Sequence, residues 1–157
     1  HREYKILPLK INNNKKKSNK LIFFENELSL QIFDLNRYKK IYCILLSNSE
    51  RCIKLGNKVL EYKKNLIKNQ IKSSDLEIDL IDENKFSEFS KNEKNFDIIY
   101  PCIGDNMSFL KRSINKYNLM INYLAREEDK FCWQFSNKGY FNFKSNIPKI
   151  LSQLKLI

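Results

Sequence analysis

Three apolar runs of the sequence are each followed by polar residues whose types bind ions and phosphates. If these runs are parallel strands, their carboxyl ends share one edge of a sheet, which is where α/β folds bind ligands. Helix N-termini at that edge present free N–H groups to an anion, and two carboxylates there are suitable ligands for Mg²⁺. The residues of this candidate ligand edge are Ser47, Asn48, Asp82, Asp105 and Asn106.

The same residues have a second interpretation, because Ser, Asn and Asp are also the ordinary N-cap residues of helices. The sequence contains no glycine-rich phosphate loop of the GxGxxG or GxxxxGK[ST] type. Helix capping is therefore the simpler interpretation of the edge residues, and a ligand site is the more specific alternative.

Nucleophilic catalysis has few candidates in this chain. The only histidine is His1, so neither a Ser–His nor a Cys–His pair can be built from the remaining residues. Cys102 precedes the turn at Gly104, and a helix start there would lower its thiol pKa. A buried cysteine at a strand end is the simpler interpretation. We therefore predict no catalytic residue, no metal site and no cofactor.

The four cysteines lack the CxxC spacing of a zinc site. Cys43, Cys102 and Cys132 lie inside apolar runs, where a thiol packs as a small hydrophobic side chain. We expect these three to be buried thiols rather than disulfides, although four cysteines would allow three pairings in an oxidising compartment.

Aromatic residues are concentrated in residues 130–143, which we predict to form a β-hairpin. The segments KFCWQF and YFNF are joined by SNKG, whose residues favour the positive φ angles of a hairpin turn. Aromatic side chains on a sheet with lysines beside them can stack nucleic-acid bases. Packing under helices and contact with a partner protein are the alternatives. With the basic tract 12–20, the candidate nucleic-acid or partner-binding residues are Lys15, Lys16, Lys17, Lys20, Lys130, Trp133, Lys138 and Tyr140.

The net charge of +11 would ordinarily indicate an anionic partner. However, the chain has 24 Lys but only 5 Arg, and proteins that read phosphates and bases favour the bidentate fork of arginine. It also has 19 Ile but only 1 Val, a ratio that core packing does not explain. Lys, Ile and Asn share AT-rich codons, so an AT-rich genome accounts for much of the basic charge.

The order of the predicted elements indicates an α/β or α+β fold with a mixed sheet. It combines an N-terminal antiparallel hairpin, central β-α-β-α units, the C-terminal aromatic hairpin and a terminal helix. Strands are predicted at residues 4–11, 41–46, 76–81 and 96–103, with the alternating run 76–81 near a sheet edge. Residues 21–33 are predicted to form one long strand or two short strands, with a break at Glu25–Asn26. Helices are predicted at residues 49–71, 107–126 and 144–156, with a short helix or loop at 82–95. The length fits one domain over residues 1–157 with 12–20 as a flexible basic insertion, and a start at His1 is typical of a fragment of a longer chain.

Three functional classes follow from these observations. The first is a non-catalytic basic module that contacts RNA or a ribonucleoprotein, and the second is a protein–protein interaction domain of a larger complex. The third is an α/β enzyme that uses a nucleotide or sugar phosphate, resting on the edge residues alone. No apolar run approaches the length of a membrane span, so we expect an intracellular protein of the cytoplasm or an organelle.

Overall fold

The structure is a computed structural model, which describes residues 18–27, 29–30, 33–136 and 139–155. The chain divides into two compact units, one ending at residue 124 and the other continuing from residue 125, and each is described by itself. The predicted strand at 4–11 and most of the basic tract 12–20 lie outside the described residues. A single domain over residues 1–157 stays a prediction. None of the helices described is long and apolar enough to cross a membrane.

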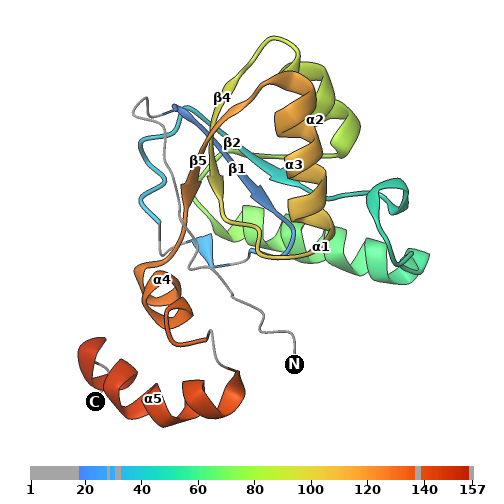
Figure 1. The fold of residues 1–157 in the computed structure, drawn as a ribbon. Coiled ribbons are helices and arrows are strands. Elements are labelled where there is room, and N and C mark those ends of the chain that lie inside the picture. The colour runs from blue at the N-terminus through green and yellow to red at the C-terminus, as the bar shows by residue number, and fades with distance from the viewer. Residues whose placement is uncertain (1–17, 28, 31–32, 137–138, 156–157) are drawn as a thin grey trace. The chain divides into compact units, whose positions relative to one another are not determined.

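The larger unit is built on a five-stranded sheet whose strands all run parallel (Figure 1). The strand order is β3-β2-β1-β4-β5. The chain adds β2 and β3 on one side of β1, and then crosses to add β4 and β5 on the other side. The direction of growth therefore reverses between β1 and β4, as in doubly wound α/β folds. The strands are β1 Lys20–Phe24, β2 Lys40–Ile44, β3 Ile78–Ile81, β4 Asn95–Ile99 and β5 Met120–Leu124.

Helices cover both faces of this sheet (Figure 1). Successive side chains of a strand point to opposite faces, so β1 contributes to two cores. Ile22 and Phe24 pack with α2 and α3, whereas Leu21 and Phe23 pack on the face that carries α1. The helices are α1 Asn57–Ser73, α2 Glu83–Ser90 and α3 Asp105–Tyr117, with a 3₁₀ turn, η2, at Asn48–Glu50.

A buried carboxylate in the centre of β4 joins distant parts of the chain. Asp97 is only 1% exposed, and its Oδ1 accepts hydrogen bonds from the Ser18 N–H (3.1 Å) and Asn122 Nδ2 (2.9 Å). Its Oδ2 accepts from Arg37 Nη2 (2.7 Å) and the Tyr38 hydroxyl (2.8 Å). Burial and the hydrogen bond to Asp97 raise the pKa of Tyr38 well above its ordinary value. Both carboxylate oxygens are thus fully used by the fold.

The predicted N-terminal antiparallel hairpin is wrong for the residues that the structure describes. β1 pairs with β2 and β4, both parallel, and no antiparallel pair occurs among the described strands. Of the one long or two short strands predicted at 21–33, the observed strand ends at Phe24, because a turn begins at Glu25 and the Glu27 N–H donates to the Phe24 carbonyl (2.9 Å). The chain then crosses over to β2 instead of turning back.

The predicted aromatic hairpin is also wrong. Residues 130–133 belong to the helix α4, Glu127–Trp133, and residues 140–143 belong to the helix α5, Tyr140–Gln153. The first turn of α4 holds three acidic residues, which the positive end of a helix dipole stabilises. The ring centroids of Phe131, in α4, and Phe135, in the turn that follows α4, are 5.4 Å apart. The predicted terminal helix is confirmed and begins four residues early.

The helix predicted at 107–126 is half correct. α3 ends at Tyr117, and Asn118 takes the left-handed conformation (φ 53°) that stops a helix. The following residues form β5, which pairs with β4 along its whole length. The buried strand predicted at 41–46 and the edge strand at 76–81 are confirmed as β2 and β3.

Candidate ligand site at the carboxyl edge of the sheet

The loops that follow β1 and β4 meet at the carboxyl edge of the sheet. Asn26 Nδ2 donates to the Pro101 carbonyl (3.4 Å), and Asn106 Nδ2 donates to Asn26 Oδ1 (3.2 Å). β1 and β4 are the strands between which the growth of the sheet reverses. In open α/β sheets this position opens toward ligands, because the connections on either side leave toward opposite faces. The candidate site is therefore built around this loop contact.

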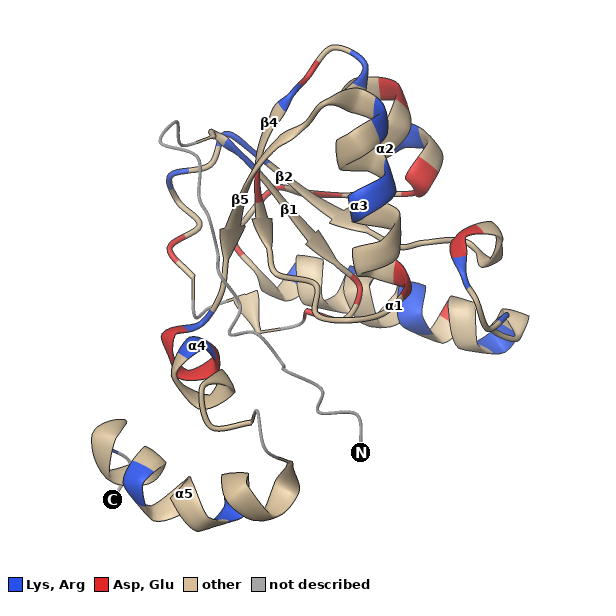
Figure 2. Ribbon diagram, viewed as in Figure 1, with Lys and Arg blue, Asp and Glu red and all other residues tan. Residues whose placement is uncertain are grey.

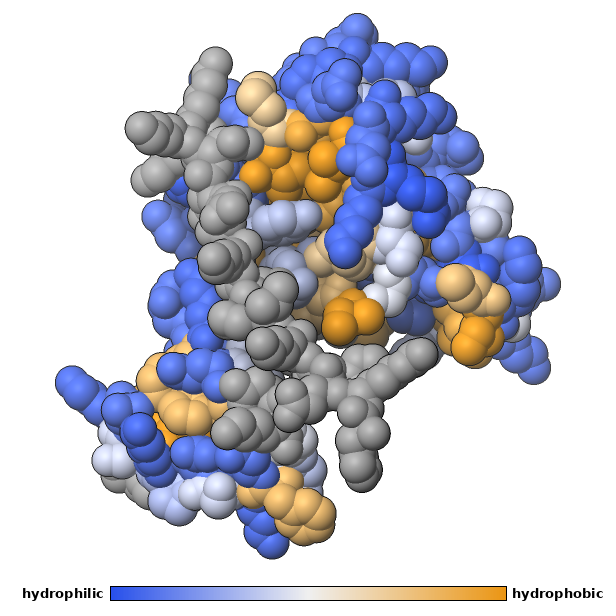
Figure 3. Space-filling view, in the orientation of Figure 1, coloured by the Kyte–Doolittle hydropathy of each residue, from blue (hydrophilic) through white to orange (hydrophobic). Residues whose placement is uncertain are grey.

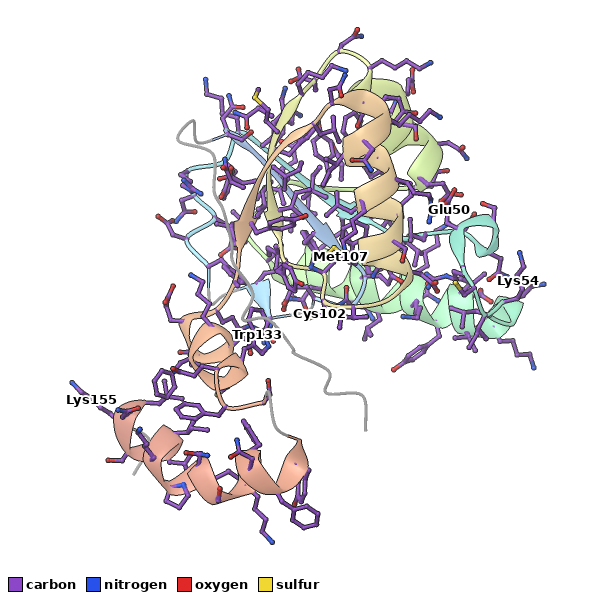
Figure 4. The ribbon with its side chains drawn as sticks, viewed as in Figure 1. Glu50, Lys54, Cys102, Met107, Trp133 and Lys155 are labelled. Carbon is purple, nitrogen blue, oxygen red and sulfur yellow. The ribbon has the colours of Figure 1, made fainter. Side chains whose placement is uncertain are left out.

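The backbone of the loop from β4 to α3 is unusual. Cys102 has a φ of 61°, a left-handed conformation that costs a non-glycine residue roughly 1–2 kcal/mol. Gly104 follows with a φ of 136°, and the apolar Ile103 between them is 98% exposed. Figure 4 shows Cys102 near the start of α3, the helix that carries Met107. Strained residues and exposed apolar side chains are concentrated in loops that contact ligands.

The N-terminus of α3 lacks a side-chain cap. Its N-cap is Gly104, and the first helical hydrogen bond runs from the Ser108 N–H to the Gly104 carbonyl (3.0 Å). The preceding N–H groups of the first turn are left available for an anion. α2 differs, because Asp82 caps it by accepting from the Lys85 N–H (2.8 Å). Of these two helices, only α3 offers its first turn to a ligand.

A buried ion pair closes the carboxyl end of β1. The side chains of Glu25 and Arg51 are 2% and 8% exposed, and Arg51 Nη2 donates to Glu25 Oε1 (2.7 Å). Arg51 also donates to the Leu46 carbonyl, while Lys63 Nζ lies 4.0 Å from Glu25 Oε1. Glu25 Oε2 and Asn106 Oδ1 are both buried and have no hydrogen-bond partner among the described residues. The switch point therefore holds two oxygen acceptors without donors.

Three of the predicted edge residues serve the local fold. The Ser47 N–H donates to Glu83 Oε2 (3.0 Å), and its hydroxyl donates to Glu83 Oε1. Burial opposes the charge of Glu83, but hydrogen bonds led by those from Ser47 outweigh it and hold the pKa of Glu83 below its ordinary value. Asn48 closes a loop through two hydrogen bonds of 2.9 Å with the backbone of Leu55, and Asp82 is the α2 cap. Ser47 and Asp82 are therefore N-caps, of η2 and α2, whereas Asn48 holds a loop.

The other two predicted edge residues lie at the switch point. Asp105 Oδ1 accepts from the Cys52 N–H (3.1 Å), and this hydrogen bond is the main cause that lowers the pKa of Asp105. A surface ion pair between Glu50 and Arg112 also joins the segment after β2 to α3. Asp105 and Asn106 thus occupy the first turn of α3. The structure brings these two predicted residues to the same place as Asn26.

The four cysteines are all thiols, and their burial differs from the prediction. Cys43 is buried, and burial raises its pKa far above the ordinary value. Cys102 is exposed because β4 ends at Ile99, before the cysteine, and Cys132 is half-buried in α4. Within the described ranges, no three His, Cys, Asp or Glu side chains are grouped to hold a metal ion.

The predicted nucleic-acid residues are distributed over both units. Lys20 begins β1 and pairs with Glu93, whereas Lys130 lies in α4 and pairs with Glu127. Trp133 ends α4, and Tyr140 begins α5 with 68% of its surface exposed. Lys15, Lys16, Lys17 and Lys138 lie outside the described residues.

Sequence reasoning missed Glu25, Asn26 and Arg51. The available signal was the polar pair Glu25–Asn26 directly after an apolar run, the same pattern that marked the other strand ends. The prediction for residues 21–33 treats this pair only as a break in β-structure, which points to no site residue. No protein-family model, no curated protein and no solved structure matches the chain.

Proposed function

We propose that residues 18–124 form a ligand-binding α/β domain that takes a small phosphorylated metabolite, of the nucleotide or sugar-phosphate class, between β1 and β4. The observation that carries this proposal is the loop from Tyr100 to Gly104, with its strained Cys102 and its exposed Ile103 at the switch point. The glycine-capped start of α3 supports it, because free N–H groups at a helix N-terminus favour phosphate.

The ligand class follows from a match of donors and acceptors. The first turn of α3 supplies N–H donors, which suit phosphate oxygens. Glu25 Oε2 and Asn106 Oδ1 are acceptors that lack donors, and the hydroxyl groups of a sugar are donors. A phosphorylated sugar or a nucleotide carries both kinds of group, whereas a simple anion carries one. This reasoning favours the third of the functions expected from the sequence.

Isosteric charge changes in two helices test this proposal. Asn106→Asp places a negative charge at the second position of α3, and Asn84→Asp places the same charge at the second position of α2. Binding of ADP, ribose 5-phosphate and inorganic phosphate to the full chain would be measured by calorimetry. We expect Asn106→Asp to weaken binding of ADP or ribose 5-phosphate roughly tenfold, which corresponds to about 1.4 kcal/mol.

The Asn84→Asp variant is the matched control and should bind like the parent protein. Inorganic phosphate should bind more weakly than either organic phosphate, because it has no sugar hydroxyl groups. Equal losses in the two variants, or no binding of any probe at millimolar concentration, would exclude the site at α3.

RNA binding stays a second candidate, favoured by the lysines of α1. Lys58, Lys64, Lys68 and Lys72 are all exposed, and their spacing places them on one side of the helix. The sheet of aromatic residues on which this candidate also depended is replaced by α4 and α5. Figure 2 shows Lys and Arg on every labelled helix, a distribution that codon bias also explains.

The salt dependence of binding tests this second candidate. A phosphate-tracking surface of four lysines would lose RNA affinity steeply between 50 and 200 mM salt, with a log–log slope near −3 for single strands. Replacing the four α1 lysines by glutamine should remove that slope. Binding that is insensitive to salt, or unchanged in the variant, would rule out α1 as the contact surface.

Protein–protein interaction is the remaining prediction from the sequence. Three apolar residues of α1 face away from the core: Val59, Tyr62 and Leu66 are 45%, 66% and 37% exposed. The residue of α1 that is buried against the sheet is Ile67. Figure 3 shows hydrophobic side chains near the start of α1 within a largely hydrophilic surface. Sedimentation of the full chain would detect self-association through this surface.

A further inference from the structure

A second concave site lies at the opposite edge of the same unit. A groove of about 350 Å³ separates the connection between β1 and β2 from the C-terminal end of α1. Leu30 and Leu35, 3% and 5% exposed, and the half-buried Leu76 form its apolar part. Asp34 and Asp75 stand at its rim. The volume is within the range of small-molecule sites.

The groove exists because of how the chain connects β1 to β2. Doubly wound folds usually place a helix in this connection, and that helix packs beside the next one on the same face. Here the described residues between Phe24 and Lys40 contain no α-helix, and Leu30, Leu35 and Tyr38 reach the core from an irregular segment. The space beside the last turns of α1 therefore stays open.

The charged residues that line the groove are both acidic, Asp34 and Asp75, in a chain whose net charge is +11. α1 ends at Ser73, so the negative end of its dipole faces this region. Asp75 follows that end, where a carboxylate is unfavourable, and Asp34 adds a second negative charge. Neither carboxylate forms an ion pair with another described residue. Lys72 lies in the last turn of α1 but forms no ion pair with either carboxylate among the described residues, so both carboxylates of the rim are available to a cation.

We propose that this groove binds an organic cation, a primary amine attached to an apolar group. The ammonium group would lie at the rim between the carboxylates of Asp34 and Asp75 and the C-terminal carbonyls of α1. The apolar group would cover Leu30, Leu35 and Leu76. This site is independent of the phosphate site proposed at the carboxyl edge.

An NMR titration of the ¹⁵N-labelled full chain tests the proposal. The probes are phenethylamine, the neutral 2-phenylethanol and the anionic 3-phenylpropionate, which share one ring. We expect phenethylamine to shift the amide signals of residues 33–36 and 70–76 and to bind at least threefold more tightly than the alcohol. 3-Phenylpropionate should produce no saturable shift there. Signals of the loop 100–106 should not move.

Charge-removing variants complete the test. Asp34→Asn and Asp75→Asn should each weaken phenethylamine binding about threefold, as expected for partly exposed charge pairs. Asp79→Asn, an exposed aspartate on β3, is the matched control and should leave the affinity unchanged. Asp75→Asn should also raise the urea midpoint of the unliganded protein, because it removes an unfavourable charge at a helix C-terminus.

Three results would overturn the proposal. One is equal affinity for the amine and the alcohol, which would show that charge does not contribute. Another is unchanged binding in both aspartate variants, and the third is the absence of saturable shifts at millimolar phenethylamine. None of these outcomes bears on the phosphate site, because the variants and signals that test that site lie in α3.

Discussion

Two of the buried carboxylates of the larger unit, Asp97 and Glu25, differ in how completely they are hydrogen-bonded. Asp97 accepts hydrogen bonds from four groups, and both of its oxygens are used. Glu25 has a close partner on one oxygen only, and the other has no donor among the described residues. Burial alone therefore does not distinguish a structural carboxylate from one near a candidate site. What distinguishes the two is whether both oxygens of the carboxylate accept hydrogen bonds.

The largest effect is expected from Asp97→Ala. The substitution leaves Arg37, Tyr38 and Asn122 without their common acceptor, so we expect it to lower the free energy of unfolding by about 4 kcal/mol. Urea denaturation followed by circular dichroism measures this value. Asp79→Ala on the exposed side of β3 is the control, with an expected change below about 0.5 kcal/mol. Similar losses in the two variants would show that Asp97 is not a structural centre.

Arg51→Ala should follow, with a loss of about 3 kcal/mol, because it leaves the Glu25 charge buried beside only the more distant Lys63. Arg112→Ala breaks an ion pair in which Arg112 is 59% exposed, and it should cost less than about 1 kcal/mol. Equal losses would mean that the Glu25–Arg51 pair behaves as a surface ion pair. Glu25→Gln removes the buried charge but keeps the shape of the side chain, so it should lower the free energy of unfolding less than Arg51→Ala does.

Tyr38→Phe removes one of the four donors to Asp97 and keeps the ring. We expect a loss of about 1.5 kcal/mol, the usual value for a hydrogen bond to a charged group. Tyr62→Phe, on a side chain that is 66% exposed, is the control and should have almost no effect. A neutral result at Tyr38 would show that the remaining three donors satisfy Asp97 by themselves.

The smallest effect concerns a third carboxylate, Glu83, whose charge the hydrogen bonds from Ser47 stabilise. Because its pKa in the folded state lies below the ordinary value of 4.5, Glu83 adds stability that is present above that pH. The contribution, about 1 kcal/mol, is lost as the pH falls through the folded-state pKa. Glu83→Gln should therefore differ from the parent at pH 7 and approach it at low pH. Glu88→Gln, whose side chain is 68% exposed, is the control and should show no such pH-dependent difference.

The sequence predicted the central part of the fold because the signals there are local. The continuous apolar run that forms β2 and the strictly alternating run that forms β3 can each be read from a few neighbouring residues. β5 could not be predicted in this way, because Met120–Leu124 has the composition of a helix end. It is a strand only because β4 lies beside it. The prediction of a hairpin at residues 130–143 was wrong for a related reason. The strand propensity of its aromatic residues favoured strands, whereas the acidic residues just before them favour the start of a helix.

The candidate site was predicted only in part. Asp105 and Asn106 were found because a strand end followed by capping residues is a local pattern. Arg51 and Asn26 were not, because their roles depend on contacts with Glu25 and Asn106 from other loops. The left-handed conformation of Cys102 has no signal in its own residue type. Both groove carboxylates were likewise indistinguishable from other aspartates until the sheet had placed them.

The strand order also has a consequence for a chain that is still being synthesised. β1 pairs with β2 on one side and with β4 on the other, so a nascent chain that ends after β3 leaves one edge of β1 open. In such a chain the hydrogen-bond donors of Ser18, Arg37 and Tyr38 also lack their acceptor, because Asp97 is synthesised later. Open strand edges of this kind pair readily with other chains. We therefore expect the open edge of β1 to be exposed to such pairing until β4 has been made.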